Sequence, residues 1–400
     1  MSTRYDVVIV GGRVAGAATA LLLARAGARV AVVERSPRGS DTLSTHGLMR
    51  AGVRQLSRWG MLGDVVAAGT PAIRETTFHY ADGESTQVAI RPSAGVDALY
   101  APRRQLLDRI LIDAAADAGA DIRHETTVVG LRRDENGRVS GVRTRVDDIP
   151  AAITVGADGV RSVVAKQVAA PVRRRGRAAS AVLYRHHADL RATGYEWAYG
   201  IGGAAGFLPT NDGMTCVFVA TTPGRMRRLV RRGGTEQAFH TLLEEAAPRM
   251  APRVAAAPAA GRMFGWPGLP GYLRHSWGPG WALVGDAGYY KDPLTTHGMT
   301  DALRDAELLA DELLECLAGV TPEAVALTRY QATRDRLSTR LFEATEQIAS
   351  YEWNLRDVRT LLRQVSAAMS EEVDYLTALP DRHPAARPRQ RSGKARHDAG

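Results

Sequence analysis

Residues 5–34 read YDVVIVGGRVAGAATALLLARAGARVAVVE, and the order of their segments indicates the fold class. It starts with a short run rich in β-branched residues, as is typical of a strand buried on both faces of a parallel sheet. A glycine-rich turn then opens an alanine- and leucine-rich helix that Gly27 ends, and a second strand over residues 29–33 leads to Glu34. This order predicts a βαβ unit that binds a dinucleotide. The helix N-terminus would face the pyrophosphate, and Glu34, 23 positions after Gly11, would bind a ribose.

The glycine pattern departs from the usual fingerprint at one position. Arg13 stands where a middle glycine normally lets the backbone approach the phosphate, so its side chain must turn away or itself meet the phosphate. The alternative for the whole segment is an ordinary strand, turn and helix without a ligand. The predicted nucleotide-binding residues lie in the turn and at the end of the second strand: Gly11, Gly12, Arg13, Val14, Ala15, Gly16, Glu34 and Arg35.

Two later segments extend the pattern. Residues 153–162 read ITVGADGVRS, and residues 281–306 read WALVGDAGYYKDPLTTHGMTDALRDA; each is an apolar run that closes on an aspartate and a glycine. With these segments, the chain resembles the FAD-dependent flavoprotein monooxygenases of the aromatic-hydroxylase type. Their superfamily also contains geranylgeranyl reductases and flavin-dependent halogenases. The resemblance covers roughly residues 4–375, with the three segments in the expected order.

The resemblance implies roles for residues of both later segments. It implies that Asp158 and Arg161 lie near FAD and the reduced nicotinamide, and that Asp286 contacts the ribityl chain. It also implies a loop and helix start beneath the isoalloxazine ring, where N–H groups stabilise negative charge on the reduced flavin. Asp305 matches an aspartate that orients this helix. The cofactor-binding residues expected from these segments are Asp158, Gly285, Asp286, Pro293, Gly298 and Met299.

No motif assigns a catalytic residue, and three side chains are candidates. The chain has Thr296 and His297 where the family commonly has glycine and glutamine, so His297 either hydrogen-bonds flavin or substrate or caps the helix. Tyr289 and Tyr290 follow the strand of this segment towards the expected cavity, with core or lid packing as the alternative. His46 lies in the segment DTLSTHGLMR, which in relatives passes close to the flavin.

Residues 100–111, YAPRRQLLDRIL, resemble a helix start whose arginine touches a phosphate or ribityl oxygen of FAD. Arg104 and Leu107 fit the Arg-x-x-Leu pattern, and Arg103 could replace Arg104 by a shift of one position. A solvent-facing arginine is the alternative for either.

The predicted fold class is α/β: a Rossmann-like FAD-binding domain interleaved with a β-sheet substrate domain, followed by C-terminal helices. The expected domains are FAD-binding residues 1–75, 101–165 and 276–320; substrate-sheet residues 76–100 and 166–275; a helical cover over 321–378; and a disordered basic tail over 379–400.

The implied reaction is oxygen transfer to an electron-rich small molecule, with NADPH or NADH and O2 as co-substrates. A second nucleotide fingerprint is missing, so the nicotinamide nucleotide would bind transiently. Aromatic residues of the predicted substrate sheet favour an apolar substrate, aromatic, polyketide-like or terpenoid, in secondary metabolism: Trp197, Tyr199, Phe207, Phe218 and Trp266. A reductase of the geranylgeranyl type, which needs no oxygen, is the alternative. A halogenase is disfavoured, because there is no lysine before Lys166.

Composition limits the remaining classes. The net charge of +9 by itself suggests a nucleic-acid partner, but 49 of the 52 basic residues are arginine, which indicates genomic composition bias. We therefore expect no nucleic-acid partner. Two cysteines and no apolar run long enough to cross a bilayer favour a reduced, cytoplasmic protein without a membrane span. The spacing of the ten histidines predicts no metal site. The oligomeric state is left open.

Overall fold

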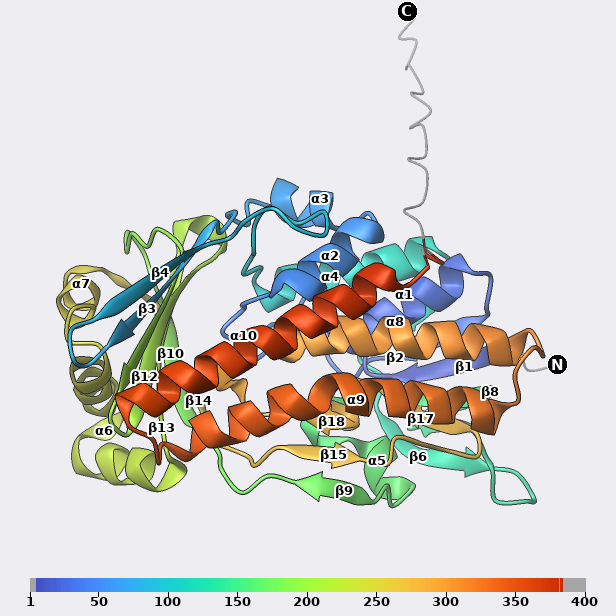
Figure 1. Ribbon diagram of the computed structural model, residues 1–400. Coiled ribbons are helices and arrows are strands. Elements are labelled where there is room, and N and C mark those ends of the chain that lie inside the picture. The colour runs from blue at the N-terminus through green and yellow to red at the C-terminus, as the bar shows by residue number, and fades with distance from the viewer. Residues whose placement is uncertain (1–4, 381, 384–400) are drawn as a thin grey trace, which may run out of the picture.

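The computed structural model describes residues 5–380, 382 and 383. These residues form an eight-stranded, a seven-stranded and a three-stranded sheet, with helices packed on both large sheets (Figure 1). Of the basic tail predicted over residues 379–400, residues 381 and 384–400 lie outside the described part of the chain.

The eight-stranded sheet contains the βαβ unit. Its strands are β1 (Tyr5–Val10), β2 (Val30–Val33), β5 (Asp121–Arg123), β6 (Val128–Arg133), β7 (Val139–Thr144), β8 (Asp148–Gly156), β16 (Trp277–Gly278) and β17 (Trp281–Leu283). The order β16-β17-β8-β1-β2-β5 is parallel except at β16, and β6 and β7 extend antiparallel from β8. Strands β17 and β2 therefore lie on opposite sides of the β8–β1 pair.

Helices cover one face of this sheet. They are α1 (Val14–Arg25), α4 (Arg104–Asp117) and α8 (Gly298–Leu317). Helix α1 is short of bulky side chains and buried almost throughout, which lets it pack between the sheet and its two neighbours. It ends just before Gly27, whose φ of +90° suits the glycine that was expected to stop it. Strands β6 and β7 cover the other face.

The seven-stranded sheet has the order β14-β10-β13-β12-β11-β3-β4. Its strands are β3 (Glu75–Tyr80), β4 (Ser85–Ala89), β10 (Ala181–His187), β11 (Tyr195–Gly200), β12 (Gly203–Pro209), β13 (Thr215–Thr221) and β14 (Ala259–Trp266). Helices α6 (Pro223–Ala246) and α7 (Ala251–Ala256) pack on one face. The small sheet joins β9 (Val172–Arg175), β15 (Tyr272–Arg274) and β18 (Tyr289–Tyr290).

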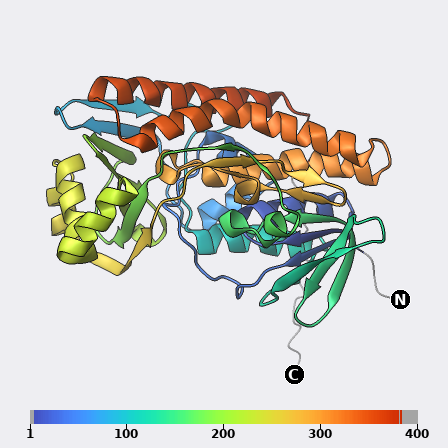
Figure 2. The same ribbon diagram turned by 90° about the horizontal axis from the view of Figure 1, so that it is seen from below.

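Two long C-terminal helices, α9 (Glu323–Ser350) and α10 (Leu355–Ala378), run along one side of both large sheets (Figures 1 and 2). Asn354 and Asp357 form a capping box that fixes the start of α10. Both helices bury side chains against the free face of the seven-stranded sheet, and α9 also packs in the core of the other sheet. The remaining helices are α2 (Arg50–Arg58), α3 (Leu62–Ala67) and α5 (Val163–Gln167).

This architecture confirms the predicted fold class, because segments from distant parts of the chain alternate between the two large sheets. The domain limits given above stay a prediction. Within the described residues, no helix has both the length and the apolar character needed to cross a bilayer.

Candidate functional site

A cavity of about 590 Å³ lies where the strands of the eight-stranded sheet end, and it extends to the seven-stranded sheet. Glu34 follows β2 and Asp286 follows β17, so the cavity crosses the carboxyl ends of four neighbouring strands. Ligands of open α/β sheets bind at this edge, and the volume is in the usual range for a small-molecule site.

The glycine turn after β1 lines the cavity and needs glycine. Gly11 has a φ of +101°, and a Cβ atom there would stand 2.5 Å from the carbonyl oxygen of Ala157. A Cβ at Gly16 would overlap the carbonyl oxygen of Gly11. Helix α1 then starts at Val14 without a side-chain cap, so its first N–H groups are left for an anion such as a pyrophosphate.

The side chain of Arg13 lines the cavity but is anchored beside it. Its guanidinium donates to Asp108 at 3.1 Å and to the carbonyl oxygen of Ser40 at 3.3 Å. Arg104 pairs with the same carboxylate at 3.1 Å and also lines the cavity. Arg103 is not among the lining residues; its guanidinium lies 3.6 Å from Asp212.

Glu34 joins the turn to the end of β2. One carboxylate oxygen accepts the N–H of Gly12 at 2.8 Å and the other accepts the N–H of Ser36 at 2.8 Å. The carboxylate is buried, yet it lines the cavity, as does Arg35. Each of its oxygens has a further lone pair that a ribose hydroxyl could use. Gly12 itself lies behind the cavity wall.

Asp158 lines the cavity and organises the turn that follows β8. Its carboxylate accepts the Ser162 hydroxyl at 2.5 Å and the N–H of Val163 at 2.6 Å, at the start of α5. Burial raises its pKa, and these hydrogen bonds oppose the shift. The exposed Arg161 lies at the rim.

Asp286 faces the cavity with a carboxylate that makes no hydrogen bond to the described residues. Burial raises its pKa to about 6, against the effect of the nearby cations Lys291 and Arg104. A desolvated carboxylate of this kind is satisfied by hydroxyl donors, which a ribityl chain has. Gly285, just before it, packs closely on Ala15 and does not line the cavity.

The loop before α8 explains one departure from the family pattern. Pro293, Gly298 and Met299 line the cavity, and Thr296 has a left-handed φ of 51°, where glycine is the usual residue. His297 precedes α8 but makes no capping hydrogen bond, so the capping interpretation is wrong. Its ring lies outside the cavity lining and pairs instead with Glu372 on α10.

The two tyrosines of β18 lie in different surroundings. Tyr290 lines the cavity, whereas Tyr289 is buried behind it, 6.4 Å from the ring of Phe342 between centroids. The packing alternative therefore describes Tyr289, and neither Tyr289 nor His297 reaches the cavity as a catalytic candidate.

His46 is the catalytic candidate that does line the cavity. It is 1 % exposed, has a φ of 71°, and its Nε2 atom lies 3.0 Å from Nε2 of His186 on β10. Burial lowers the pKa of both rings, that of His186 to about 4, so the pair is neutral near pH 7. The Cys216 thiol lies nearby, with all three ligand atoms within 4.8 Å. The separation of the two nitrogens is that of a hydrogen bond, which uses the atoms that a metal ion would need.

Beyond the nucleotide turn, one wall of the cavity is apolar and aromatic. It is formed by Val182, Tyr184, Phe218, Trp266, Tyr290 and Leu294. Of the aromatic residues named in the predicted substrate sheet, Phe218 and Trp266 line the cavity. Trp197, Tyr199 and Phe207 belong to the cores on the two faces of the sheet.

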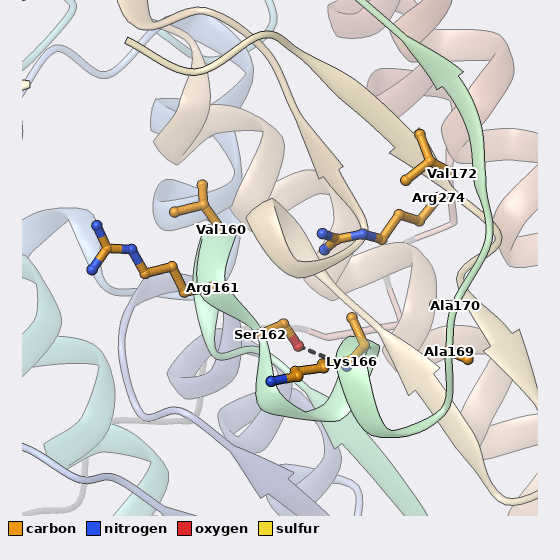
Figure 3. Close-up of a pocket in the computed structure, with 9 residues that line it drawn as sticks. Val160, Arg161, Ser162, Lys166, Ala169, Ala170, Val172 and Arg274 are labelled. Carbon is orange, nitrogen blue, oxygen red and sulfur yellow. Dashed lines mark hydrogen bonds between the residues drawn. The ribbon is translucent and has the colours of Figure 1, made fainter. Parts of the chain in front are cut away.

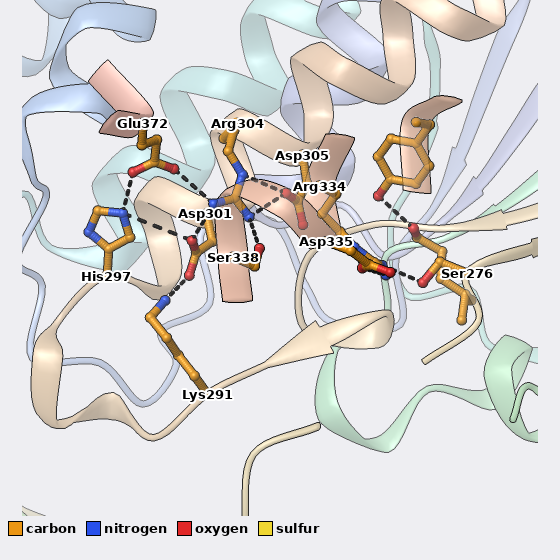
Figure 4. A network of polar contacts seen from close by, with 12 residues as sticks. Ser276, Lys291, His297, Asp301, Arg304, Asp305, Arg334, Asp335, Ser338 and Glu372 are labelled. Atoms are coloured by element: carbon orange, nitrogen blue, oxygen red, sulfur yellow. Dashed lines mark hydrogen bonds and ion pairs between the residues drawn. The ribbon is translucent and has the colours of Figure 1, made fainter. Parts of the chain in front are cut away.

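A buried ionic network that no sequence pattern predicted lies beside the cavity (Figure 4). Lys291 pairs with Asp301, and Arg304 joins Asp301 and Glu372, each at 2.9 Å. The partner of Glu372 on the other side is His297, at 2.6 Å. All of these residues except Glu372 lie within the quoted 281–306 segment, and Lys291 is also one of only three lysines in the sequence.

A second, shallow hollow of about 640 Å³ adjoins the cavity at Val160 and Arg161 (Figure 3). Lys166 and Arg274 add positive charge to its wall. Ser162 at its centre accepts the N–H of Ala165, which fixes the start of α5. The hollow thus borders the turn that carries Asp158.

Comparisons with known proteins agree with this geometry. A family model described as an FAD binding domain matches residues 4–345. The menaquinone reductase of Mycolicibacterium smegmatis is 30% identical over 347 residues, which cover 80% of this chain and 78% of that protein. The kynurenine 3-monooxygenase of Salinispora arenicola is 26% identical over 431 residues, covering 95% of this chain and 86% of that protein.

Solved structures share the fold. PqsL of Pseudomonas aeruginosa, in complex with 2-aminobenzoylacetate, has a TM-score of 0.77 at 24% identity and covers 92% of this chain and 100% of its own. Because the FAD-binding family model spans most of the residues, the chain belongs to this family, within the superfamily of aromatic-hydroxylase-type flavoprotein monooxygenases, and is an FAD-dependent oxidoreductase.

Proposed function

We propose that this oxidoreductase is a monooxygenase that uses NADPH or NADH and O2 to hydroxylate or epoxidise an aromatic, polyketide-like or terpenoid small molecule. The observation that carries the proposal is the continuity of the cavity. One space holds an uncapped helix N-terminus, the carboxylate of Glu34 and, further on, an aromatic wall on a second sheet. A dinucleotide and an apolar substrate would therefore meet in it.

The residues present fit FAD. The first N–H groups of α1 would bind the pyrophosphate, Glu34 the adenosine ribose, and Asp286 the ribityl hydroxyls. When bound, FAD would accept a hydride from the nicotinamide nucleotide and activate O2 for transfer of one oxygen atom. The aromatic wall, with Phe218 and Trp266, would orient the substrate and exclude water from the ring.

The neutral pair of His46 and His186 would contribute hydrogen bonding without charge. Each ring can donate from one nitrogen and accept at the other, and their shared hydrogen bond uses one nitrogen from each. Nδ1 of His46 has no hydrogen-bond partner among the described residues. Because His46 also lines the cavity, it is the first residue to test for contact with a substrate hydroxyl or keto group.

A reductase that saturates a double bond is the second candidate. The observation that favours it is the 30% identity to a menaquinone reductase over most of both chains. Such an enzyme would pass electrons from the flavin to an organic acceptor and would need no O2.

The visible absorption spectrum of the purified protein separates these functions. Flavin bands that bleach with NADPH under anaerobic conditions and return in air, with O2 uptake coupled to an oxygenated aromatic product, would support the monooxygenase. Reoxidation only by an organic acceptor such as a menaquinone would support the reductase. A colourless protein that FAD does not reconstitute would exclude both.

A basic tail could also attract nucleic acid, and a truncation tests this. Removal of the residues after Leu379 should leave flavin content and activity unchanged, whereas tail-driven, salt-sensitive nucleic-acid binding would disappear. Roles in secondary metabolism and in the cytoplasm stay predictions.

A further inference from the structure

Lys291 is a lysine buried in the wall of the flavin cavity. Its side chain is 6 % exposed and extends from the loop after β18 to Asp301, in the first turn of α8 (Figure 4). Both Lys291 and Asp301 line the cavity, as do Gly298 and Met299 at the start of the same helix. A buried lysine is uncommon unless it is paired. The ion-pair partner of Lys291 among the described residues is Asp301.

The charges around Lys291 leave no surplus of positive charge. Asp301 is shared with Arg304, which also binds Asp305 at 2.7 Å and Glu372 at 2.9 Å. The groups that face Lys291 are Asp301, Arg304 and Asp305 from α8, Glu372 from α10, Asp286 across the cavity, His297, and the ring of Tyr289 at 5.3 Å. Even with Lys291 protonated, two cations face at least three carboxylates. A further negative charge placed here would therefore favour the protonated form of Lys291.

FAD bound in the expected direction would place the negative charge of its reduced ring near Lys291. Glu34 and the N-terminus of α1 lie on the β2 side of the cavity, whereas Asp286 follows β17 on the other side. With its pyrophosphate at α1 and its adenosine ribose at Glu34, FAD would extend its flavin end towards Asp286. Lys291 and the N-terminus of α8 lie on the wall there.

We propose that Lys291 is a charge-compensating residue that takes up a proton when FAD in this cavity is reduced, and that its ammonium then stabilises the negative charge on the isoalloxazine ring. The inference rests on the proposed FAD site. The ring receives two electrons and one proton as a hydride from the nicotinamide nucleotide, and the proton on Lys291 comes from solvent.

The electrostatics of the network agree with this role. Burial lowers the pKa of Lys291 to about 7, with Arg304 acting in the same direction. A new negative charge on the flavin would raise that pKa. Loss of the proton leaves Asp301 hydrogen-bonded to Arg304, so the network can lose and regain this proton without losing its other contacts.

Sulfite titration of the holoenzyme tests the proposal without turnover. Sulfite adds through sulfur to N5 of oxidised FAD, leaves one negative charge on the ring, and bleaches the visible flavin band. We expect Lys291→Met to weaken sulfite binding at pH 6.5 by roughly tenfold to a hundredfold, the effect of one charge about 6–12 Å away at an effective dielectric constant of about 20. Lys166→Met, on the exposed face of α5, should behave as the wild type.

The pH dependence distinguishes charge from structure. The ratio of the Kd values of Lys291→Met and wild type should shrink as the pH rises from about 6.5 to about 9, because the wild-type lysine loses its proton. Lys291→Arg keeps its charge, so it should bind sulfite as tightly as the wild type at pH 6.5 and more tightly at pH 9. Comparing variants at the same pH cancels the titration of sulfite itself.

Other outcomes would overturn the inference. One is equal sulfite affinity of wild type and a Lys291→Met variant that retains FAD. If Lys291→Met loses FAD, the arginine variant decides, because a constant ratio of its Kd to that of the wild type across this pH range excludes proton uptake by Lys291. A wild-type protein that does not bind FAD would exclude both the proposed function and this inference. A wild-type protein that shows the expected sulfite binding but never yields an oxygenated product would exclude only the monooxygenase function.

Discussion

The Nε2 atoms of His46 and His186 lie 3.0 Å apart in the cavity wall, although 140 positions separate the two residues in the chain. One comes from the loop after β2 and the other from β10, so the pair joins the two large sheets. Both rings are almost fully buried, at 1 % and 5 % exposure.

This pair should make the stability of the protein sensitive to acid. Burial lowers the pKa of His186 to about 4 and that of His46 well below its usual value, so below pH 6.5 the unfolded chain binds protons that the folded pair does not. The contribution of the neutral pair to the free energy of unfolding should be fully present above about pH 6.5. It should fall towards pH 4 by about 1.4 kcal/mol per pH unit for each proton. In urea unfolding, His186→Gln should reduce this slope, and the partly exposed His240→Gln should not. Equal slopes for all three proteins would contradict the assignment.

Gly16→Ala should destabilise the protein and weaken FAD binding. The added Cβ would overlap the carbonyl oxygen of Gly11, so the turn that faces the pyrophosphate must move. We expect a loss of about 1–3 kcal/mol of stability in thermal or urea unfolding. Gly63→Ala, in α3, has open space for its Cβ and should leave FAD affinity unchanged. A fully loaded, stable Gly16→Ala protein would argue against the turn as the pyrophosphate site.

Asp286→Asn should have opposite effects on the apoprotein and on FAD binding. Burial raises the pKa of Asp286 to about 6, above its value in the unfolded chain, so its contribution to stability is present below about pH 4 and is lost as the pH rises through 6. At pH 8 the amide should therefore raise the Tm of the apoprotein. The same change should weaken FAD binding by about 1–3 kcal/mol, because the ribityl hydroxyls lose an ionised acceptor.

Asp374→Asn, on the exposed side of α10, is the control for the Asp286 variant and should change neither quantity. FAD affinity can be measured by fluorescence titration of the apoprotein. An unchanged affinity in Asp286→Asn would show that the ribityl chain does not bind at Asp286.

Glu372→Gln should be strongly destabilising, in contrast to its neighbour. Glu372 is buried between His297 and Arg304, and its interactions with them lower its pKa despite its burial. Loss of its charge removes one of the buried partners of Arg304, at an expected cost of about 3–5 kcal/mol. Glu371→Gln, on the same helix as Glu372, removes an exposed ion pair with Arg340 of α9. The expected loss of stability is about 0–1 kcal/mol. Similar unfolding free energies for the two variants would show that the network is not structurally important.

The fold class and the family could be predicted from local sequence patterns alone. A β-branched strand, a glycine turn, a small-residue helix and a terminal acid are consecutive in the chain, so local preferences and spacing specify the βαβ unit. The later Asp-Gly and Gly-Asp segments likewise sit at strand ends. For this reason several residues that line the cavity at the strand ends, such as Gly11, Glu34 and Asp286, were among the predicted residues.

Which other side chains meet at the cavity depends on the packing of distant elements and became visible in the structure. The sequence left three roles for His297, which were contact with flavin, contact with substrate and capping of the helix. Its partner Glu372 lies 75 positions away on another helix. The partner of His46 comes from a strand of the other sheet. Tyr289 and Tyr290 are adjacent in the chain, yet one faces the core and the other the cavity, because successive residues of a strand point to opposite faces. Contacts of this kind depend on how distant elements pack, which no local pattern encodes.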